Sequence, residues 1–300
     1  MSPTGSVSSR PFSLATALAV TALGILAMVG GSAALATRSG LSLRAQIALG
    51  TLLLAMPAVA ALTLAPTRWP SVRGPAPMTK RTLPLSVLLG AALWVGSAGL
   101  MEVQSLIAPM PQGHLDVFRA LHRALAPRNA IDALVSILVI AVLPGVCEEL
   151  VLRGVCLPSL FRWLEGRSTP TAAAAVATAA VGSAARTHSR SGRSATIAAV
   201  ATALLFAAIH LDAYRFLFVF VIGLVFGFLR LALDSLWPSV FAHLSLNTLT
   251  FLVAPFVDDP SQPYTPSPTL GVLCLVTGVA AAWPLLRALG VSVDSPGAAS

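Results

Sequence analysis

IDALVSILVIAVLPGVCEELVLRGVC, the stretch at residues 131–156, decides which fold this sequence can adopt. It is mostly apolar and exceeds the roughly 20 residues with which a helix crosses a hydrocarbon core of about 30 Å. Lipid offers backbone N–H and C=O groups no partner outside their own helix, so the stretch predicts a transmembrane helix. It nevertheless carries Glu148, Glu149 and Arg153 near its end. Since an ionisable group costs about 2.5–3.5 kcal/mol to insert into lipid, these side chains need a partner or a function there.

Apolar segments of similar length recur along the chain of 300 residues, which is 56% hydrophobic and only 10% charged, with a mean hydropathy of +0.84. In a soluble domain about one residue in four is charged. The composition therefore predicts an all-α fold, a polytopic membrane helix bundle of about eight transmembrane helices. The expected spans are residues 14–36, 47–65, 83–101, 131–156, 195–211, 216–229, 236–257 and 269–286.

The net charge of +8 and the pI near 10.9 do not indicate a nucleic-acid partner. The Arg residues lie in loops between apolar runs rather than on a basic helix, which favours the lipid bilayer as the partner of this charge. Cys147, Cys156 and Cys274 lie in or beside apolar stretches. That placement favours a structural role over a disulfide framework.

Loop charges predict the orientation of the helices, because Lys and Arg accumulate on the cytoplasmic side. With eight spans, most basic loop residues fall inside together with both termini, whereas Asp258 and Asp259 fall outside. Residues 171–185 are expected to lie at the interface, since a further span there would reverse everything that follows. Residues 14–36 exceed a usual signal-peptide core, which favours a retained helix. The Arg- and Ala-rich style of the chain suggests a bacterial inner membrane.

An amphipathic surface helix is predicted where Leu115, Phe118, Leu121 and Leu125 recur at helical spacing among charged residues. The chain then divides into four parts. These are a polar tail (1–12), N-terminal transmembrane helices with the surface helix (13–130), a core that holds the intramembrane polar groups (131–255, with an Ala- and Arg-rich insertion at 166–194), and a last helix with the C-terminal tail (256–300).

The polar groups inside apolar runs form three motifs on three spans: Glu148, Glu149 and Arg153; Phe206 and His210; His243 and Asn247. Residues four apart share one helix face, so Glu149 and Arg153 can pair, while Glu148, about 100° around, faces a different neighbour. One carboxylate is then neutralised and the other remains available. By the same spacing His243 and Asn247 point the same way, and Phe206 stacks one turn below His210.

A carboxylate beside a histidine in a low-dielectric pocket suits general-base chemistry on water, which predicts that Glu148 and His210 activate a water molecule. His243 and the Asn247 amide can donate hydrogen bonds to the oxyanion of peptide hydrolysis. The alternative is structural, with Glu149 and Arg153 as an ion pair and each buried His or Asn as a link between helices. Three motifs on different spans of one chain favour a joint function.

At these residues the sequence resembles the CAAX-protease and bacteriocin-processing (Abi) family of intramembrane proteases. The family pattern is Glu-Glu-x-x-x-Arg, Phe-x-x-x-His and His-x-x-x-Asn on successive helices, and the likeness covers about residues 131–255. It implies a glutamate-dependent protease in which Glu148 and His210 activate water and His243 and Asn247 bind the oxyanion. Glu149, which belongs to the same catalytic set, and Arg153 would hold the site in shape, with Phe206 as further structural support.

The resemblance also bears on cofactor and substrate. No cofactor is expected, since the sequence has no His-Glu-x-x-His helix and Asn is a poor zinc ligand; zinc held through Glu and His is the alternative. The implied substrate is a membrane protein or a lipidated or hydrophobic peptide, cleaved near a C-terminal tail or sorting anchor. A non-catalytic immunity or scaffold protein of the same family stays open. A proton-coupled transporter is less favoured, because the sequence lacks paired half-helices in two related halves.

Two features of the sequence complicate this site. The insertion at 166–194 is longer than is usual in the family. On the predicted arrangement of eight spans, His210 lies near the outer end of its helix and His243 in the inner half of its own. Tilted or broken helices would be needed to bring the two imidazoles level.

Overall fold

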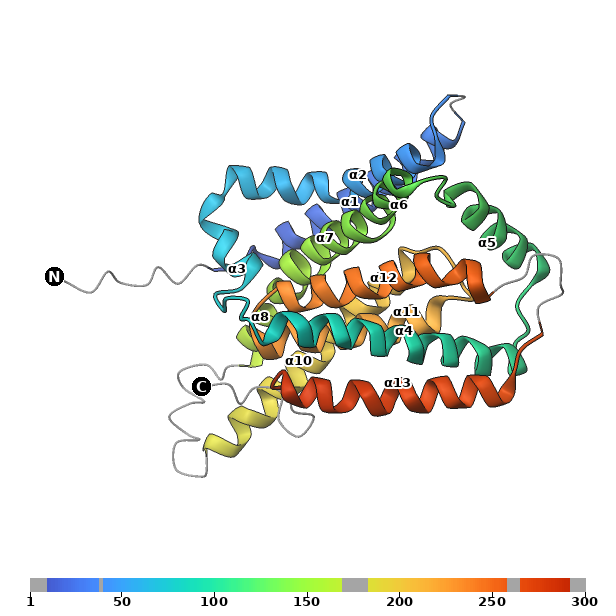
Figure 1. Ribbon diagram of the computed structural model, residues 1–300. Coiled ribbons are helices and arrows are strands. Elements are labelled where there is room, and N and C mark those ends of the chain that lie inside the picture. Colours follow the sequence, from blue (N-terminus) through green and yellow to red (C-terminus); the bar gives the residue numbers. More distant parts are fainter. Residues whose placement is uncertain (1–9, 38–39, 169–182, 258–264, 292–300) are drawn as a thin grey trace.

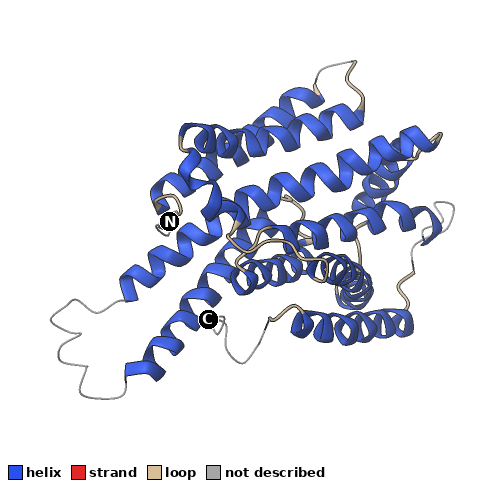
Figure 2. Ribbon diagram, turned by 60° about the vertical axis from the view of Figure 1, so that its left-hand side comes forward, coloured by secondary structure: helices blue, strands red, loops and turns tan. Residues whose placement is uncertain are grey.

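Helices are the only regular secondary structure in the part that the computed structural model describes, namely residues 10–37, 40–168, 183–257 and 265–291 (Figures 1 and 2). Among these residues, six helices are long and apolar enough to cross a membrane: Leu14–Ala36, Leu43–Leu64, Thr82–Ile107, Ala130–Gly166, Phe216–Leu233 and Pro268–Ala288. The predicted all-α polytopic membrane bundle is thus confirmed. The exact number of eight spans is not.

The first half of the chain begins with the antiparallel helices α1 (Leu14–Ala36) and α2 (Leu43–Leu64). Each starts at a serine, Ser13 or Ser42, whose hydroxyl accepts the backbone N–H three residues on. Such caps satisfy an N–H group that the helix itself leaves free. The short η1 (Pro66–Arg68) and α3 (Trp69–Arg73) then lead into α4 (Thr82–Ile107).

Helix α5 (Gln112–Leu125) is the amphipathic helix expected at this position. Leu115 and Leu125 are buried and Val117 is largely exposed. Arg119, one of the charged residues of this helix, is also buried.

The predicted span 131–156 is part of one long rod of five consecutive segments: α6 (Ala130–Ile137), η2 (Leu138–Val142), α7 (Leu143–Glu149), η3 (Leu150–Cys156) and α8 (Leu157–Ser168). We call it the central rod. Both η2 and η3 are π-helical, with wider turns than an α-helix. Such segments occur often at functional sites. They flank the short α7, which ends in Glu148 and Glu149.

The second half contains α10 (Ser183–Ala208), α11 (Phe216–Leu233), α12 (Trp237–Val257) and α13 (Pro268–Ala288). Helix α10 begins at Ser183 rather than at the predicted residue 195, so part of the insertion at 166–194 extends this helix. Figure 1 shows α4, α12 and α13 side by side. The predicted interfacial segment 171–185 falls mostly outside the described residues, and Asp258 and Asp259 lie wholly outside them.

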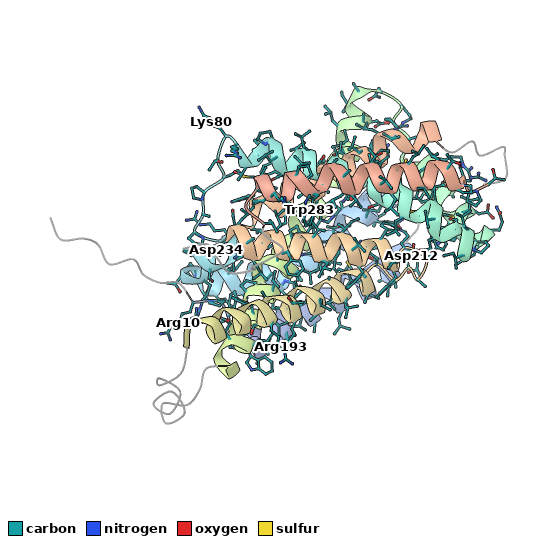
Figure 3. The ribbon with its side chains drawn as sticks, turned by 90° about the horizontal axis from the view of Figure 1, so that it is seen from below. Arg10, Lys80, Arg193, Asp212, Asp234 and Trp283 are labelled. Atoms are coloured by element: carbon teal, nitrogen blue, oxygen red, sulfur yellow. The ribbon has the colours of Figure 1, made fainter. Side chains whose placement is uncertain are left out.

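Charged residues gather at the two ends of the bundle. In Figure 3, Arg10, Lys80, Arg193 and Asp234 lie at one end, which we call the basic end, while Asp212 lies toward the other. Apolar side chains such as Leu18, Leu26, Leu273 and Val276 are exposed between the ends. Exposed leucine and valine on the sides of a helix bundle suit contact with lipid rather than water.

Candidate active site

Glu149 and Arg153 form an ion pair inside the central rod. Arg153 Nη1 lies 3.0 Å from Glu149 Oε1, and neither side chain has any exposed surface. Arg153 Nη2 donates a 2.9 Å hydrogen bond to the Gly223 carbonyl of α11, and the guanidinium lies over the Phe206 ring at 4.4 Å. Removing one partner of a buried pair leaves an uncompensated charge, so the pair links α7, η3 and α11 in one arrangement. The predicted pairing is confirmed.

Gly223 allows α10 and α11 to approach closely enough for this network. A Cβ atom at this position would lie 2.9 Å from Phe206 Cδ1 and 3.2 Å from the Cα of Ala203. The absence of a side chain therefore brings Phe206 against α11. It also leaves the Gly223 carbonyl within reach of Arg153.

His243, on α12, lies between the two glutamates. Its Nδ1 is 3.2 Å from Glu149 Oε1, and its Nε2 is 3.9 Å from Glu148 Oε2. The first contact is a hydrogen bond, in which Nδ1–H donates to the carboxylate; the second exceeds hydrogen-bonding distance. The prediction that Glu148 faces a different neighbour from Glu149 is wrong in this respect, because both carboxylates reach the same imidazole.

His210, just after α10, is held by the residue one turn earlier. Its Nδ1 lies 2.7 Å from the Phe206 carbonyl oxygen, and the two rings meet edge to face at 4.9 Å. A carbonyl oxygen only accepts, so Nδ1 carries the proton and Nε2 of the neutral ring is free to accept. The predicted contact of Phe206 with His210 is confirmed.

Asn247 contacts the central rod at a carbonyl one turn before a proline. Pro144 has no N–H for the carbonyl four residues earlier, that of Ile140. Asn247 Nδ2 lies 3.4 Å from this Ile140 oxygen, at the long limit of a hydrogen bond. Asn247 and His243 therefore point the same way, as predicted, and both face the central rod.

Phe206 brings the two imidazoles level. Its ring centroid is 4.9 Å from that of His210 and 5.7 Å from that of His243. The difference in depth expected from the sequence is thus absent in the folded chain, because the one Phe206 ring contacts both imidazoles.

Two carboxylate oxygens in this cluster lack protein partners. Glu148 Oε2 and Glu149 Oε2 are buried and accept no hydrogen bond from the described residues. Glu148 is the more open of the two, with 16% of its side chain exposed against none for Glu149. A carboxylate that is buried yet not neutralised by a cation is a suitable base for a bound water molecule. The arrangement can thus hold and deprotonate water.

Zinc binding through Glu and His would require several donor atoms that point to one position. Among the described residues, no three His, Cys, Asp or Glu side chains are grouped so as to hold a metal ion. His243 Nδ1 is directed at Glu149 and His210 Nδ1 at a carbonyl. This donor set does not fit zinc as it stands.

Gly223, Phe226 and the Ile140 carbonyl belong to the site but were not predicted. Phe226 packs its ring 5.4 Å from that of His243 and 5.6 Å from the Arg153 guanidinium. It lies on an apolar span that carries none of the three motifs. The only signal in the sequence was the pair of small residues, Gly223 and Gly227, on one face of that span.

These features define a class: a helical membrane protein with two glutamates and two histidines gathered inside its bundle. Residues 130–249 match the family model described as "Type II CAAX prenyl endopeptidase Rce1-like". Residues 130–249 therefore form a domain of the CAAX protease type, a family of hydrolases, and the apolar helices show that the chain is an integral membrane protein. The match contains all three motifs. Comparisons with curated proteins and with solved structures found no match.

Proposed function

We propose that the protein is an intramembrane endopeptidase in which Glu148 activates the attacking water. The observation that carries the proposal is the pair of Glu148 Oε2 and His243 Nε2, which face each other at 3.9 Å. The gap is too long for a direct hydrogen bond, and a water molecule can bridge polar atoms at this separation. Glu148 Oε2 has no other partner among the described residues.

In the first step Glu148 takes one proton from the water, whose oxygen forms a bond to the carbonyl carbon of the substrate. His210 Nε2, free to accept because Nδ1 is bound to the Phe206 carbonyl, accepts a hydrogen bond from the second hydrogen of the water, which stays on the oxygen, and so orients the water. The electron pair of the carbonyl bond moves to oxygen. A tetrahedral oxyanion results.

His243 and Asn247 stabilise this oxyanion. Glu149 at Nδ1 and Glu148 near Nε2 hold the ring of His243 in place, and Nε2 donates to the oxyanion when the ring carries both protons. The Asn247 amide supplies a second donor when it leaves the long contact to Ile140. Glu148 then returns its proton to the amide nitrogen, the C–N bond breaks, and a carboxylic acid and an amine leave.

The substrate we propose is a membrane-associated protein or hydrophobic peptide, cleaved near a C-terminal tail or sorting anchor. The family description names CAAX prenyl endopeptidases, which points to a tail that carries a lipid or lies in the membrane. A site inside the bundle is reached most directly from the bilayer. Because Lys and Arg accumulate on the cytoplasmic side, we place the basic end and both termini on the cytoplasmic side of a bacterial inner membrane.

The test is cleavage by the purified protein in nanodiscs, with hydrophobic peptides anchored in the same bilayer and H₂¹⁸O as the solvent. Hydrolysis puts one ¹⁸O atom into the new carboxyl group, which mass spectrometry detects at the cleaved bond. His210→Ala should lower the rate by about 10²-fold or more, the contribution expected of a group that assists proton transfer.

His122 gives a matched control, because it repeats the local contacts of His210 on α5. Its Nδ1 lies 2.9 Å from the Phe118 carbonyl, and its ring centroid is 4.1 Å from that of Phe118. His122→Ala should cleave like the wild type. If no peptide is cleaved, or if both variants match the wild type, the chain is better explained as a non-catalytic scaffold or immunity protein.

A further inference from the structure

A cavity of about 450 Å³ opens at the basic end of the bundle, between α3, α4 and α12. Its lining includes Arg73, Met78, Leu83, Trp237 and Phe241, and none of the proposed catalytic residues. The volume lies within the range of about 300–1,000 Å³ that is typical of small-molecule sites. The cavity is therefore a second candidate site.

One wall of the cavity is fixed by the backbone. The Leu236 N–H donates a 2.8 Å hydrogen bond to the Arg73 carbonyl, and the Ala76 N–H donates one of 3.4 Å to the Asp234 carbonyl. Gly74 adopts a φ of +78°, and a Cβ atom there would lie 2.0 Å from the Asp234 oxygen. Only glycine fits this approach, so the loop that follows α3 is held against the start of α12.

The lining combines apolar surface with one free cation. Trp237 and Phe241 lie one turn apart on α12 with ring centroids 6.5 Å apart, and 42% of Trp237 and 39% of Leu83 is exposed. The Arg73 side chain is exposed and makes no ion pair or hydrogen bond with the described residues. The other arginines here differ, because Arg230 pairs with Asp234 at 2.9 Å and Arg68 donates to the backbone carbonyls of residues 10 and 11.

The position of the cavity matches the level of lipid headgroups. The apolar α4 begins at Thr82, beside Leu83, and α12 begins at Trp237. Lys80 and Arg81 directly precede α4 and are exposed. Tryptophan and basic residues concentrate where a membrane helix leaves the hydrocarbon core.

We propose that this cavity binds an anionic phospholipid. Its phosphate lies on Arg73, whose planar guanidinium suits two parallel hydrogen bonds to a phosphate. The upper part of an acyl chain runs along Leu83, Trp237 and Phe241, while Lys80 and Arg81 favour a headgroup with net negative charge. A soluble anion would not contact the apolar wall of Leu83, Trp237 and Phe241. A zwitterionic lipid carries no net charge to balance Arg73, Lys80 and Arg81.

The full chain in nanodiscs tests this with phospholipids brominated on the acyl chain, which quench tryptophan fluorescence on contact. Brominated phosphatidylglycerol should quench more than brominated phosphatidylcholine, and Trp237→Phe should remove this difference. Arg73→Gln should require about fivefold more phosphatidylglycerol for half of the quenching, the change expected when one cation near an anionic lipid is lost.

Arg287 and Trp283 on α13 give the matched controls. The Arg287 guanidinium lies 4.9 Å from the Trp283 ring, and neither residue lines the cavity. Arg287→Gln and Trp283→Phe should keep the difference between the two lipids. Equal quenching by both lipids in the wild type, or an Arg73→Gln curve that overlays that of Arg287→Gln, would overturn the proposal. The readout is independent of peptide cleavage, so it stands or falls separately from the protease mechanism.

Discussion

His243 Nδ1 lies 3.2 Å from Glu149 Oε1, and this contact ties the imidazole that faces Glu148 to a buried ion pair. Glu149 Oε1 thus accepts hydrogen bonds from two partners, Arg153 at 3.0 Å and His243 at 3.2 Å. A hydrogen bond at one ring nitrogen sets what the other nitrogen can do. We therefore assign Glu149 the positioning of His243, and Glu148 the chemistry.

The two neighbouring glutamates should respond differently to removal. Glu149→Ala leaves Arg153 buried without its carboxylate and should lower the free energy of unfolding by about 3–5 kcal/mol. Glu148→Ala removes a side chain that forms no ion pair with Lys or Arg among the described residues, and should cost about 1 kcal/mol or less. Thermal unfolding in detergent, followed by tryptophan fluorescence, measures both. Equal losses would contradict the division of roles.

Glu149 and His243 should be coupled in catalysis. If Glu149 acts through His243, Glu149→Gln lowers kcat in the wild-type background but has little further effect in His243→Ala. A double-mutant cycle on kcat should give a coupling energy of about 1–3 kcal/mol, as for residues in direct contact. Additive effects in the cycle would show that the two residues act separately.

Phe206 should affect activity beyond its effect on stability. Phe206→Leu removes the ring that contacts Arg153 and both imidazoles. Each aromatic contact of this kind contributes about 0.5–1.5 kcal/mol, so kcat should fall as His210 and His243 lose their common support. Phe251→Leu, at a buried phenylalanine on α12, is the control. Both variants should unfold at lower temperature, and only Phe206→Leu should change kcat at temperatures where both are folded.

Gly223 should tolerate no side chain. Gly223→Ala places a methyl group 2.9 Å from Phe206 Cδ1 and should destabilise the fold by about 1–3 kcal/mol, as overpacking does. In α1, a Cβ atom at Gly30 would meet nothing within 4 Å, and Gly30→Ala should be neutral or stabilising by up to about 1 kcal/mol. The unfolding temperatures of the two variants, measured side by side, test whether the approach of α10 to α11 matters. A stable Gly223→Ala protein would contradict it.

Metal removal should leave the activity unchanged. The described His, Cys, Asp and Glu side chains do not gather as a metal site, and the proposed proton transfers run between Glu148, water and the substrate. The cleavage rate is therefore expected to be the same before and after dialysis against a strong chelator. Loss of activity that zinc alone restores would favour the zinc alternative.

The membrane helices could be predicted closely from the sequence because lipid imposes a length and a polarity on them. The span 14–36 coincides with α1, and the span 216–229 with most of α11. Prediction was weakest where polarity changes gradually. The Arg- and Ser-rich start of α10 carries no apolar stripe, so the helix was expected to begin at residue 195 rather than at Ser183.

The residues of the site could be named from the sequence, but not all of their partners could. The spacing of an ideal α-helix predicted different neighbours for Glu148 and Glu149. In the structure both carboxylates lie near His243, in a rod that the π-helical η2 and η3 interrupt. The Gly223 carbonyl carries no side-chain signal at all. Its bond to Arg153 depends on how α11 packs against the rod, which helical spacing within one segment does not determine.

The central claim, that Glu148 activates the attacking water, is tested most directly by the cleavage rate of Glu148→Gln in nanodiscs. Glutamine keeps the shape of the side chain but takes up no proton from water. Glu165→Gln, in α8 of the same rod, is the control for loss of one negative charge. We predict a rate at least about 10²-fold below wild type for Glu148→Gln, with an unchanged unfolding temperature and an unaffected control. A folded Glu148→Gln protein that cleaves the peptide at the wild-type rate would contradict the account.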